Sequence, residues 1–329
     1  MTADIQHLNP VKTGSPNLRP VRLPQDLKAV ADLVELCFAA SLDADGRRFI
    51  RQMRQAGSSR SRYQRFSNFP PGIKGFVWVE DGQIVGNINL IPVLAQSRKA
   101  YLIANVSVHP DHRRQGIAHT LTQASLAFAE KRRVRHLWLQ VDEGNQEAQH
   151  LYQDFGFEER ARRTVWHSQP GLTTIKVPPS VQVKSRRGVD WPKQKAWLDT
   201  LYDQEIRWNL ALRTLPLSSG ITGAVARVFN EHKFRQWSAS HRGRWIGSLS
   251  WQNSHSQADW LWFAAPPEKR ELALCALIPE ARQDLHARGL VRPMRTLAVN
   301  FPAGECVDAF KAIDFQAHQT LIWMKKELS

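Results

Sequence analysis

Cysteine is scarce in this chain of 329 residues. The three cysteines, Cys37, Cys275 and Cys306, are far apart in the sequence, and no CxxC pair occurs. Such an odd and sparse set argues against a disulfide framework and lacks the spacing of a zinc site. Free thiols persist in a reducing compartment, so we expect a cytoplasmic protein without a bound metal.

Long apolar runs are also missing. No segment reaches the roughly 18 consecutive apolar residues that a membrane-spanning helix needs. The first twenty residues, MTADIQHLNPVKTGSPNLRP, contain no apolar core of a signal peptide. The sequence therefore predicts neither a membrane-spanning segment nor an export signal, and we expect no membrane partner.

Acidic residues are fewer than basic residues in this chain. The chain has 45 Lys and Arg against 30 Asp and Glu, a formal net charge of +15. The excess occurs in both halves, with 23 basic and 16 acidic residues in 1–170 and 22 and 14 in 171–329. Residues 46–79 contain no acid at all. Such a field favours anionic ligands, namely nucleic acid, acidic proteins or phosphorylated small molecules, although a basic but otherwise ordinary enzyme fits equally. Seven arginines gather in the acid-free stretch: Arg47, Arg48, Arg51, Arg54, Arg60, Arg62 and Arg65.

The length suits two domains, and the second half repeats the first. Similar segments recur in the same order at offsets between 157 and 164 residues, and a repeat of domain length indicates two copies of one fold. We expect a loose arm over residues 1–17, a domain over 18–168, a proline-containing linker over 169–177 and a second domain over 178–329. The matched pairs are Asp26 with Asp190, Gly86 with Gly247, Phe157 with Phe315, and Trp166 with Trp323.

Alternating strand and helix patterns run through the first domain. Residues 76–93 predict a hairpin that turns at Asp81-Gly82, and residues 100–110 predict a further strand. An amphipathic helix over 116–133, a strand over 135–141, a short helix over 145–155 that ends at Gly156, and a closing strand over 160–167 follow.

The segment between the strand at 106–108 and the helix that begins near Gly116 has the properties of an anion site. The first turn of a helix presents unpaired backbone N–H groups and the positive end of the helix dipole. Gly116 removes a side chain, so that a phosphate could approach the backbone, while Arg113 and Arg114 add charge and donors. A diphosphate fits here on physical grounds, and a solvated helix start is the alternative.

Two motifs stand at a characteristic separation. The first, V-x-V-x-P-x-x-R-x-x-G-x-A, consists of Val106, Val108, Pro110, Arg113, Gly116 and Ala118. The second consists of Asn145, Ala148, Leu151, Tyr152, Gly156 and Phe157.

Together these motifs resemble those of the GNAT superfamily of acetyl-CoA-dependent N-acetyltransferases. The resemblance is good over residues 19–168 and weak over 178–329. It implies an α/β (α+β) chain of two tandem GNAT folds, each a mixed, mostly antiparallel twisted sheet flanked by helices.

The resemblance implies an enzyme that transfers an acetyl group from acetyl-CoA directly to a primary amine of an unidentified acceptor. Tyr152 would be the general acid toward the leaving thiolate, and an N–H of the strand, that of Val108, would face the thioester oxygen. The positive charge of the chain favours an anionic acceptor. The residues expected to bind acetyl-CoA are Val106, Ser107, Val108, Arg113, Arg114, Gln115, Gly116, Ile117, Ala118, His119 and Asn145.

The general base and the acceptor are not indicated by any motif. Asp142, Glu143 and Glu80 are the candidate carboxylates, with Glu80 expected to be solvated beside its hairpin turn, and a water relay is an equal alternative. The oligomeric state is likewise not indicated.

The second domain lacks the features of the first motif. Its corresponding loop has no glycine after the basic pair and places Glu268 and Glu271 where a phosphate would bind. Phe310 stands roughly in the place of Tyr152, and Asp314 in the place of Gly156. We therefore expect a degenerate copy that does not bind acetyl-CoA productively. Its tryptophans serve either core packing or ligand stacking, and they include Trp245, Trp251, Trp260 and Trp262.

A non-catalytic role is the alternative for the whole chain. A GNAT-fold module that binds nucleic acid or an acidic partner would account for the net charge and the arginines between residues 47 and 65. The intact loop at 113–118, together with Asn145 and Tyr152, favours the enzyme instead.

Overall fold

The computed structural model divides into two compact units. Unit 1 comprises residues 1–160 and 323–329, and unit 2 comprises residues 161–322. Among the described residues no helix is long and apolar enough to cross a membrane. Most of the expected arm and all of the expected linker except Gln169 lie outside the described residues. The structure describes residues 15–40, 42–58, 73–169, 178–228, 230–290 and 295–328.

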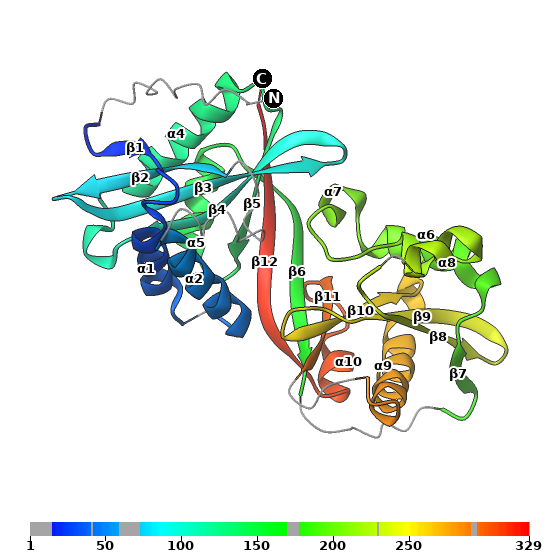
Figure 1. Cartoon of the computed structure of the whole chain (residues 1–329). Coiled ribbons are helices and arrows are strands. Elements are labelled where there is room, and N and C mark those ends of the chain that lie inside the picture. The colour runs from blue at the N-terminus through cyan, green and yellow to red at the C-terminus, as the bar shows by residue number, and fades with distance from the viewer. Residues whose placement is uncertain are drawn as a thin grey trace. The chain divides into compact units, whose positions relative to one another are not determined.

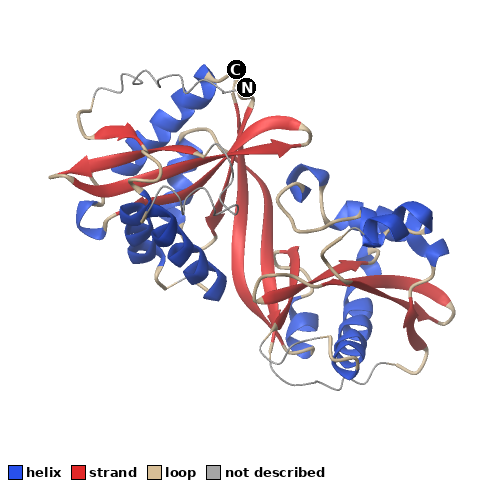
Figure 2. Ribbon diagram, viewed as in Figure 1, coloured by secondary structure: helices blue, strands red, loops and turns tan. Residues whose placement is uncertain are grey.

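From the hairpin at residues 76–93 onward, unit 1 follows the strand and helix order expected from the sequence, whereas the helix over Ala44–Gly57, which contains Arg47, Arg48, Arg51 and Arg54, was not expected (Figures 1 and 2). Its elements are β1 (Leu18–Pro20), α1 (Leu27–Phe38), α2 (Ala44–Gly57), β2 (Lys74–Glu80), β3 (Gln83–Ala95), β4 (Arg98–Val108), η1 (Pro110–His112), α4 (Ile117–Lys131), β5 (His136–Asp142), α5 (Gln146–Asp154) and the start of β6 (Glu158–Ser168).

The sheet of unit 1 is covered by helices on both faces. Its strands lie in the order β1-β2-β3-β4-β5, with β4 and β5 parallel and the other pairs antiparallel. Side chains alternate between faces along a strand. Phe76 of β2 accordingly meets Phe128 of α4, with ring centroids 6.1 Å apart, whereas Val77 joins the core formed with α1 and α2.

Unit 2 repeats this order of elements with extra short helices after its first long helix (Figure 1). Its elements are β7 (Val181–Ser185), η2 (Gly188–Asp190), α6 (Trp191–Leu201), α7 (Gln204–Arg207), η3 (Leu215–Leu217), α8 (Gly220–Val228), β8 (Phe234–His241), β9 (Arg244–Gln252), β10 (Ala258–Ala264), η4 (Pro267–Lys269), α9 (Arg270–Ala287), β11 (Thr296–Pro302), α10 (Val307–Ala312) and most of β12 (Phe315–Glu327).

The strand pairing of unit 2 matches that of unit 1. An antiparallel series β7-β8-β9-β10 is followed by the parallel pair of β10 and β11, as β4 pairs with β5. Its core centres on large aromatic side chains, including Trp251 and Trp262, which are fully buried. The expected fold class, two mixed α/β units of the same order, is confirmed.

The division between the units falls inside β6, earlier than the expected end of the first domain at residue 168. The later residues of β6 pack in unit 2. There Arg163 donates to the side chain of Asn300 and to the carbonyl of Leu201, and Trp166 stacks on Phe310 at 4.7 Å. Conversely, residues 323–329 at the end of the chain belong to unit 1. A sequence repeat predicts domains made of contiguous segments. It does not reveal that the end of β6 belongs to unit 2 and the end of the chain to unit 1.

Candidate active site

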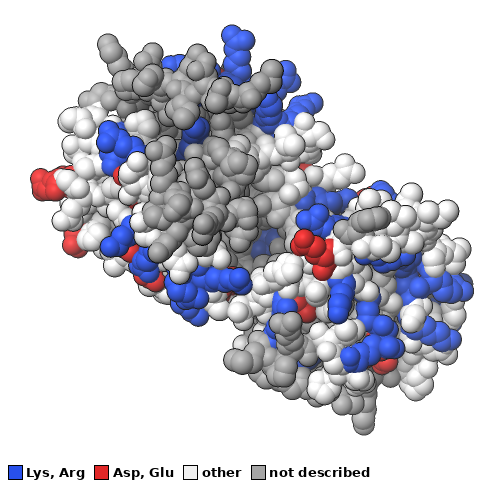
Figure 3. Space-filling view, in the orientation of Figure 1, with Lys and Arg blue, Asp and Glu red and all other residues white. Residues whose placement is uncertain are grey.

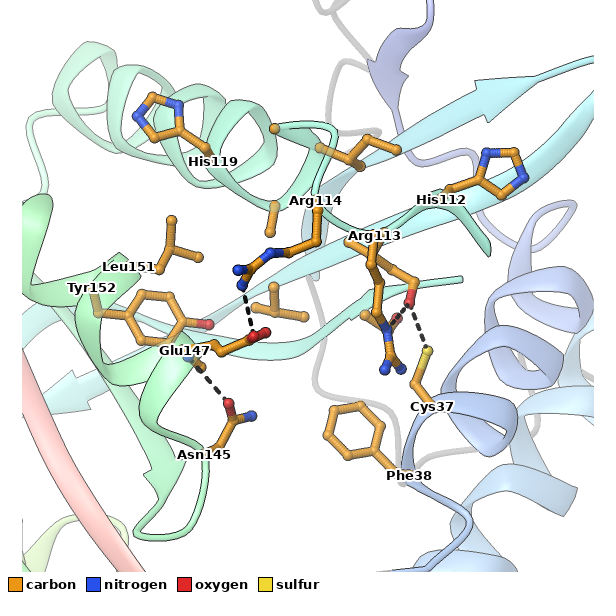
Figure 4. Close-up of a pocket in the computed structure, with 17 residues that line it drawn as sticks. Cys37, Phe38, His112, Arg113, Arg114, His119, Asn145, Glu147, Leu151 and Tyr152 are labelled. Carbon is orange, nitrogen blue, oxygen red and sulfur yellow. Dashed lines mark hydrogen bonds and ion pairs between the residues drawn. The ribbon is translucent and has the colours of Figure 1, made fainter. Parts of the chain in front are cut away.

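A pocket of about 470 Å³ lies in unit 1 beside the open end of β4 (Figure 4). The structure brings together around it all the residues expected at the site except Gln115, which is exposed and does not line it. The lining residues are Cys37, Phe38, Val106, Ser107, Val108, His112, Arg113, Arg114, Gly116, Ile117, Ala118, His119, Asn145, Glu147, Ala148, Leu151 and Tyr152.

Strand β4 forms the floor of the pocket because it departs from regular pairing near its end. Its register with β5 covers residues 100–103, upstream of the lining strand. Asn105 adopts a left-handed φ of 53°, and the register with β3 shifts between Asn87 and Asn89. The buried Asn87 side chain donates to the carbonyl of Asn105 at 2.8 Å and supports this bulge. The bulge alters the direction of the backbone at 106–108, which lines the pocket.

The start of α4 forms one end of the pocket. Gly116 precedes the helix with φ of 77°, a conformation that costs glycine least, and nothing lies within 4 Å of where its side chain would begin. The Thr120 N–H is the first to bond within the helix, to the Gly116 carbonyl. Within the described residues, the N–H groups of 116–119 have no acceptor. They therefore present donors and the positive end of the helix dipole to the pocket.

The adjacent basic residues of the loop before α4 point to different partners. Arg114, at φ of 63°, reaches the Glu147 carboxylate at 2.6 Å. Arg113 turns its Nε to the Val108 carbonyl at 3.3 Å. His112 contacts Glu80 at 2.9 Å through Nδ1. The expectation that Glu80 is simply solvated was wrong, because the loop carries His112 to the hairpin on which Glu80 lies.

Helix α1 supplies the wall opposite α5. The Cys37 Sγ donates to the Val108 carbonyl at 3.3 Å, and Phe38 lines the pocket beside it. Burial raises the pKa of the Cys37 thiol, and the nearby Arg113 guanidinium offsets this only in part. The thiol therefore stays protonated near neutral pH and serves as a hydrogen-bond donor.

Helix α5 positions the expected acid. The Asn145 side chain caps the helix by accepting from the Ala148 N–H at 3.1 Å, and Gly156 ends it with φ of 76°. Between them Tyr152 is 5% exposed and packs against Phe157 with ring centroids 5.8 Å apart. Burial raises the pKa of the Tyr152 phenol above its ordinary value, so the hydroxyl is neutral at physiological pH. Figure 4 shows the hydroxyl directed into the pocket.

Several lining residues were not expected at the site from the sequence. Ala148 and Leu151 were named only as members of the second motif and Glu147 not at all, although all three lie on the helix of Asn145 and Tyr152, so helical spacing could have placed them. Cys37 and Phe38 carry no such signal, because they come from α1, far upstream of the motifs.

The candidate bases lie outside the pocket lining. The Asp142 carboxylate accepts from the Gly144 N–H at 2.9 Å, and neither Glu143 nor Glu80 borders the pocket. Glu147 is the carboxylate that does so among the described residues, and it pairs with Arg114.

The corresponding region of unit 2 has a different character. A pocket of about 380 Å³ there is lined by Glu268, Glu271 and Glu305, with Arg270 paired to Glu305. Burial, aided by the nearby glutamates, raises the pKa of the Cys306 thiol to about 11. These carboxylates oppose phosphate binding.

The aromatic residues singled out in unit 2 belong mainly to its core. Phe310, the counterpart of Tyr152, is fully buried against Trp166. Trp251 and Trp262 are buried and donate to Asp259 and Gln252. The half-buried Trp260 stacks on Trp262, and Trp245 contacts Trp197. These contacts favour packing over ligand stacking.

Comparison with known proteins agrees with this geometry. Residues 44–157 match the sequence profile of the acetyltransferase (GNAT) family. The [ribosomal protein bS18]-alanine N-acetyltransferase of Escherichia coli is 41% identical over 59 residues, 18% of this chain and 40% of that protein. The streptothricin acetyltransferase of Streptomyces lavendulae is 40% identical over 55 residues, 17% of this chain and 29% of that protein. The chain thus spans less than half the length of these relatives.

The fold of nearly the whole chain occurs in a solved structure. A GCN5-related N-acetyltransferase from Sphaerobacter thermophilus superposes with a TM-score of 0.60 at 15% identity, covering 95% of this chain and 96% of that one. At this identity the likeness shows a shared fold. The match to the acetyltransferase (GNAT) family therefore concerns residues 44–157, and the likeness over nearly the whole chain is one of fold.

Proposed function

We propose that the N-terminal unit transfers an acetyl group from acetyl-CoA directly to a primary amine, and that unit 2 does not bind acetyl-CoA. One observation carries the proposal. A single pocket combines the open start of α4, the backbone of 106–108 and the buried phenol of Tyr152. These supply, respectively, an anion site, strand-like backbone groups for an extended chain and a proton donor.

Three groups of residues in the pocket fit acetyl-CoA, namely the start of α4 with Arg114, the strand at 106–108, and Asn145. The N–H groups of 116–119 suit the diphosphate, and the open space at Gly116 admits it. Arg114 would exchange Glu147 for the diphosphate, since an ion pair this exposed contributes little stability. The strand at 106–108 suits the amide-containing pantetheine arm. Asn145 keeps its side-chain amino group available after capping α5 through its oxygen.

The chemistry assigned to the chain's residues is an acyl transfer with no covalent enzyme intermediate. The amine nitrogen forms a bond to the thioester carbon and loses a proton to a base that is not assigned. The Val108 N–H would stabilise the oxyanion that forms. As the carbon–sulfur bond breaks, Tyr152 donates its proton to the departing thiolate, and its neutral state suits that role.

Calorimetric titration with acetyl-CoA tests the proposal. The native chain is expected to bind in the micromolar range, and Gly116→Glu to lose at least 100-fold in affinity, because a carboxylate would occupy the diphosphate position. Gly82→Glu is the matched control, since Gly82 has the same φ of 77°, open space around it and a place outside the pocket. It is expected to bind as the native chain does.

Failure of the native chain to bind acetyl-CoA would contradict the proposal. Salt-sensitive binding to an oligonucleotide would then support the non-catalytic alternative.

A further inference from the structure

The basic residues that line the pocket differ in whether a carboxylate is paired with them. Arg114 is paired with Glu147, and His112 with Glu80. Arg113 is also exposed at the pocket, yet within the part of the chain that the structure describes it forms no ion pair with any carboxylate. The pocket therefore has one arginine whose charge is not neutralised by the protein.

The Arg113 guanidinium, which has no carboxylate partner among the described residues, lies on the side of the pocket away from the start of α4 (Figure 4). Residue 113 is extended, with φ of −70° and ψ of 161°, whereas Arg114 is left-handed, so the two neighbouring side chains diverge. Figure 4 shows Arg113 directed toward Cys37 and Phe38 of α1, and His119 and the start of α4 on the other side of the pocket.

The hydrogen bonds of Arg113 determine which edge of the guanidinium is available. Its Nε donates to the Val108 carbonyl, which also accepts from the Cys37 thiol. This bond fixes the plane of the group beside the strand that would hold the thioester. The guanidinium also interacts with the Cys37 thiol, and the donors that it keeps at the exposed side of the pocket suit a carboxylate.

We propose that Arg113 binds the acceptor rather than acetyl-CoA, and that the acceptor is an amine that also carries a carboxylate. Phe38 would provide an apolar surface next to that carboxylate. The assignment rests on the proposed function, because an acceptor presupposes acyl transfer. It makes Arg113 a specificity-determining residue and leaves the diphosphate to Arg114 and the α4 backbone.

Matched pairs of amines test the assignment. The formation of free CoA is followed with L-phenylalanine against L-phenylalaninamide, and with glycine against glycinamide, which differ in the carboxylate. The native chain is expected to prefer the carboxylate member by about 10-fold in kcat/KM, an ordinary effect of one charge-assisted hydrogen-bonded pair. Arg113→Gln is expected to lose that preference while its affinity for acetyl-CoA, measured by calorimetry, changes less than 2-fold.

Two further variants separate the roles. Arg113→Lys retains the charge without the two-pronged donor and is expected to recover only part of the preference. Arg114→Gln is expected to weaken acetyl-CoA binding and to retain the preference for carboxylates.

Three outcomes would overturn the assignment. They are a preference for the amides, turnover of none of the four amines by a chain that binds acetyl-CoA, and an Arg113→Gln variant that weakens acetyl-CoA binding as much as Arg114→Gln does. Absence of acetyl-CoA binding by the native chain would instead contradict the proposed function.

Discussion

Tyr152 combines a buried ring with a hydroxyl that lines the pocket. Its ring contacts Phe157 inside the apolar face of α5, while its hydroxyl reaches the pocket. Because burial raises its pKa above the ordinary value of about 10, Tyr152 does not ionise in the physiological range.

Replacing Tyr152 with Phe keeps the packing and removes the proton donor. We expect kcat to fall by about 10² to 10⁴, the usual contribution of general acid catalysis, with little change in the affinity for acetyl-CoA. Steady-state kinetics with the amines above and calorimetry measure the two quantities. Native kcat in Tyr152→Phe would show that the phenol is only a packing group.

Asp26 plays a structural role at the entry to α1. Its carboxylate, 8% exposed as a residue, accepts from both terminal nitrogens of Arg19 at 2.7 and 3.0 Å and from the Arg22 N–H at 2.6 Å. Burial alone would raise the pKa of Asp26, but these bonds and charges outweigh it and hold the pKa below its ordinary value.

The depressed pKa of Asp26 predicts a stability that depends on pH. A carboxylate with a lowered folded-state pKa stabilises fully above the unfolded value of about 4, and the contribution is lost as pH falls through the folded value. Asp26→Asn is expected to lower the free energy of unfolding by about 1–3 kcal/mol at pH 7. Urea denaturation should show this difference shrinking below about pH 4, and a difference independent of pH would contradict the ionic origin.

At the scale of elements, the last strand of the chain contributes to unit 1 although most of it belongs to unit 2. Trp323 and Met324 are each 1% exposed and belong to unit 1. The Leu328 N–H donates to the Arg135 carbonyl at 2.8 Å, and Lys325 lies over the Trp138 ring at 5.7 Å. The end of the chain therefore packs in the unit that holds the pocket of about 470 Å³.

Trp323→Ala is expected to destabilise unit 1 by about 3–5 kcal/mol, the usual cost of removing a buried aromatic side chain. In the presence of acetyl-CoA, the variant should therefore unfold at a lower temperature than the native chain. Gln316→Ala, at an exposed position of the same strand, is the control and should change stability by less than about 0.5 kcal/mol. If the two variants lose the same stability, Trp323 does not contribute to the core of unit 1.

At the scale of the molecule, the two units carry different residues at the corresponding helix starts. Unit 1 presents Gly116 and unpaired N–H groups at the start of α4, whereas the start of α9 carries Glu268 and Glu271. Phe310 also lacks the hydroxyl of Tyr152. The second copy keeps the packing of the fold without the donors of the pocket.

One equivalent of acetyl-CoA per chain is therefore expected in a calorimetric titration. Two equivalents would show that the carboxylates of unit 2 do not prevent binding. Replacing both Glu268 and Glu271 with Gln should leave the stoichiometry at one acetyl-CoA per chain. Unit 2 would still lack counterparts of Gly116 and of the Tyr152 phenol.

The sequence by itself determined the features that local chemistry controls. Hydrophobic periodicity and turn residues predict the strands and helices between residues 76 and 167, since these depend on neighbouring residues, and the repeat predicts a second unit of the same order. The loop at 113–118 and the spacing of Asn145 and Tyr152 predict most of one pocket, because a helix start and a helix face are local structures.

Tertiary structure alone decided what depends on distant parts of the chain. It placed Cys37 and Phe38 opposite α5, paired Glu80 with His112, and sent Arg113 and Arg114 in different directions. It also assigned the end of β6 to unit 2 and residues 323–329 to unit 1. Strand pairing and helix packing join residues far apart in the chain, and no local pattern records which ones meet.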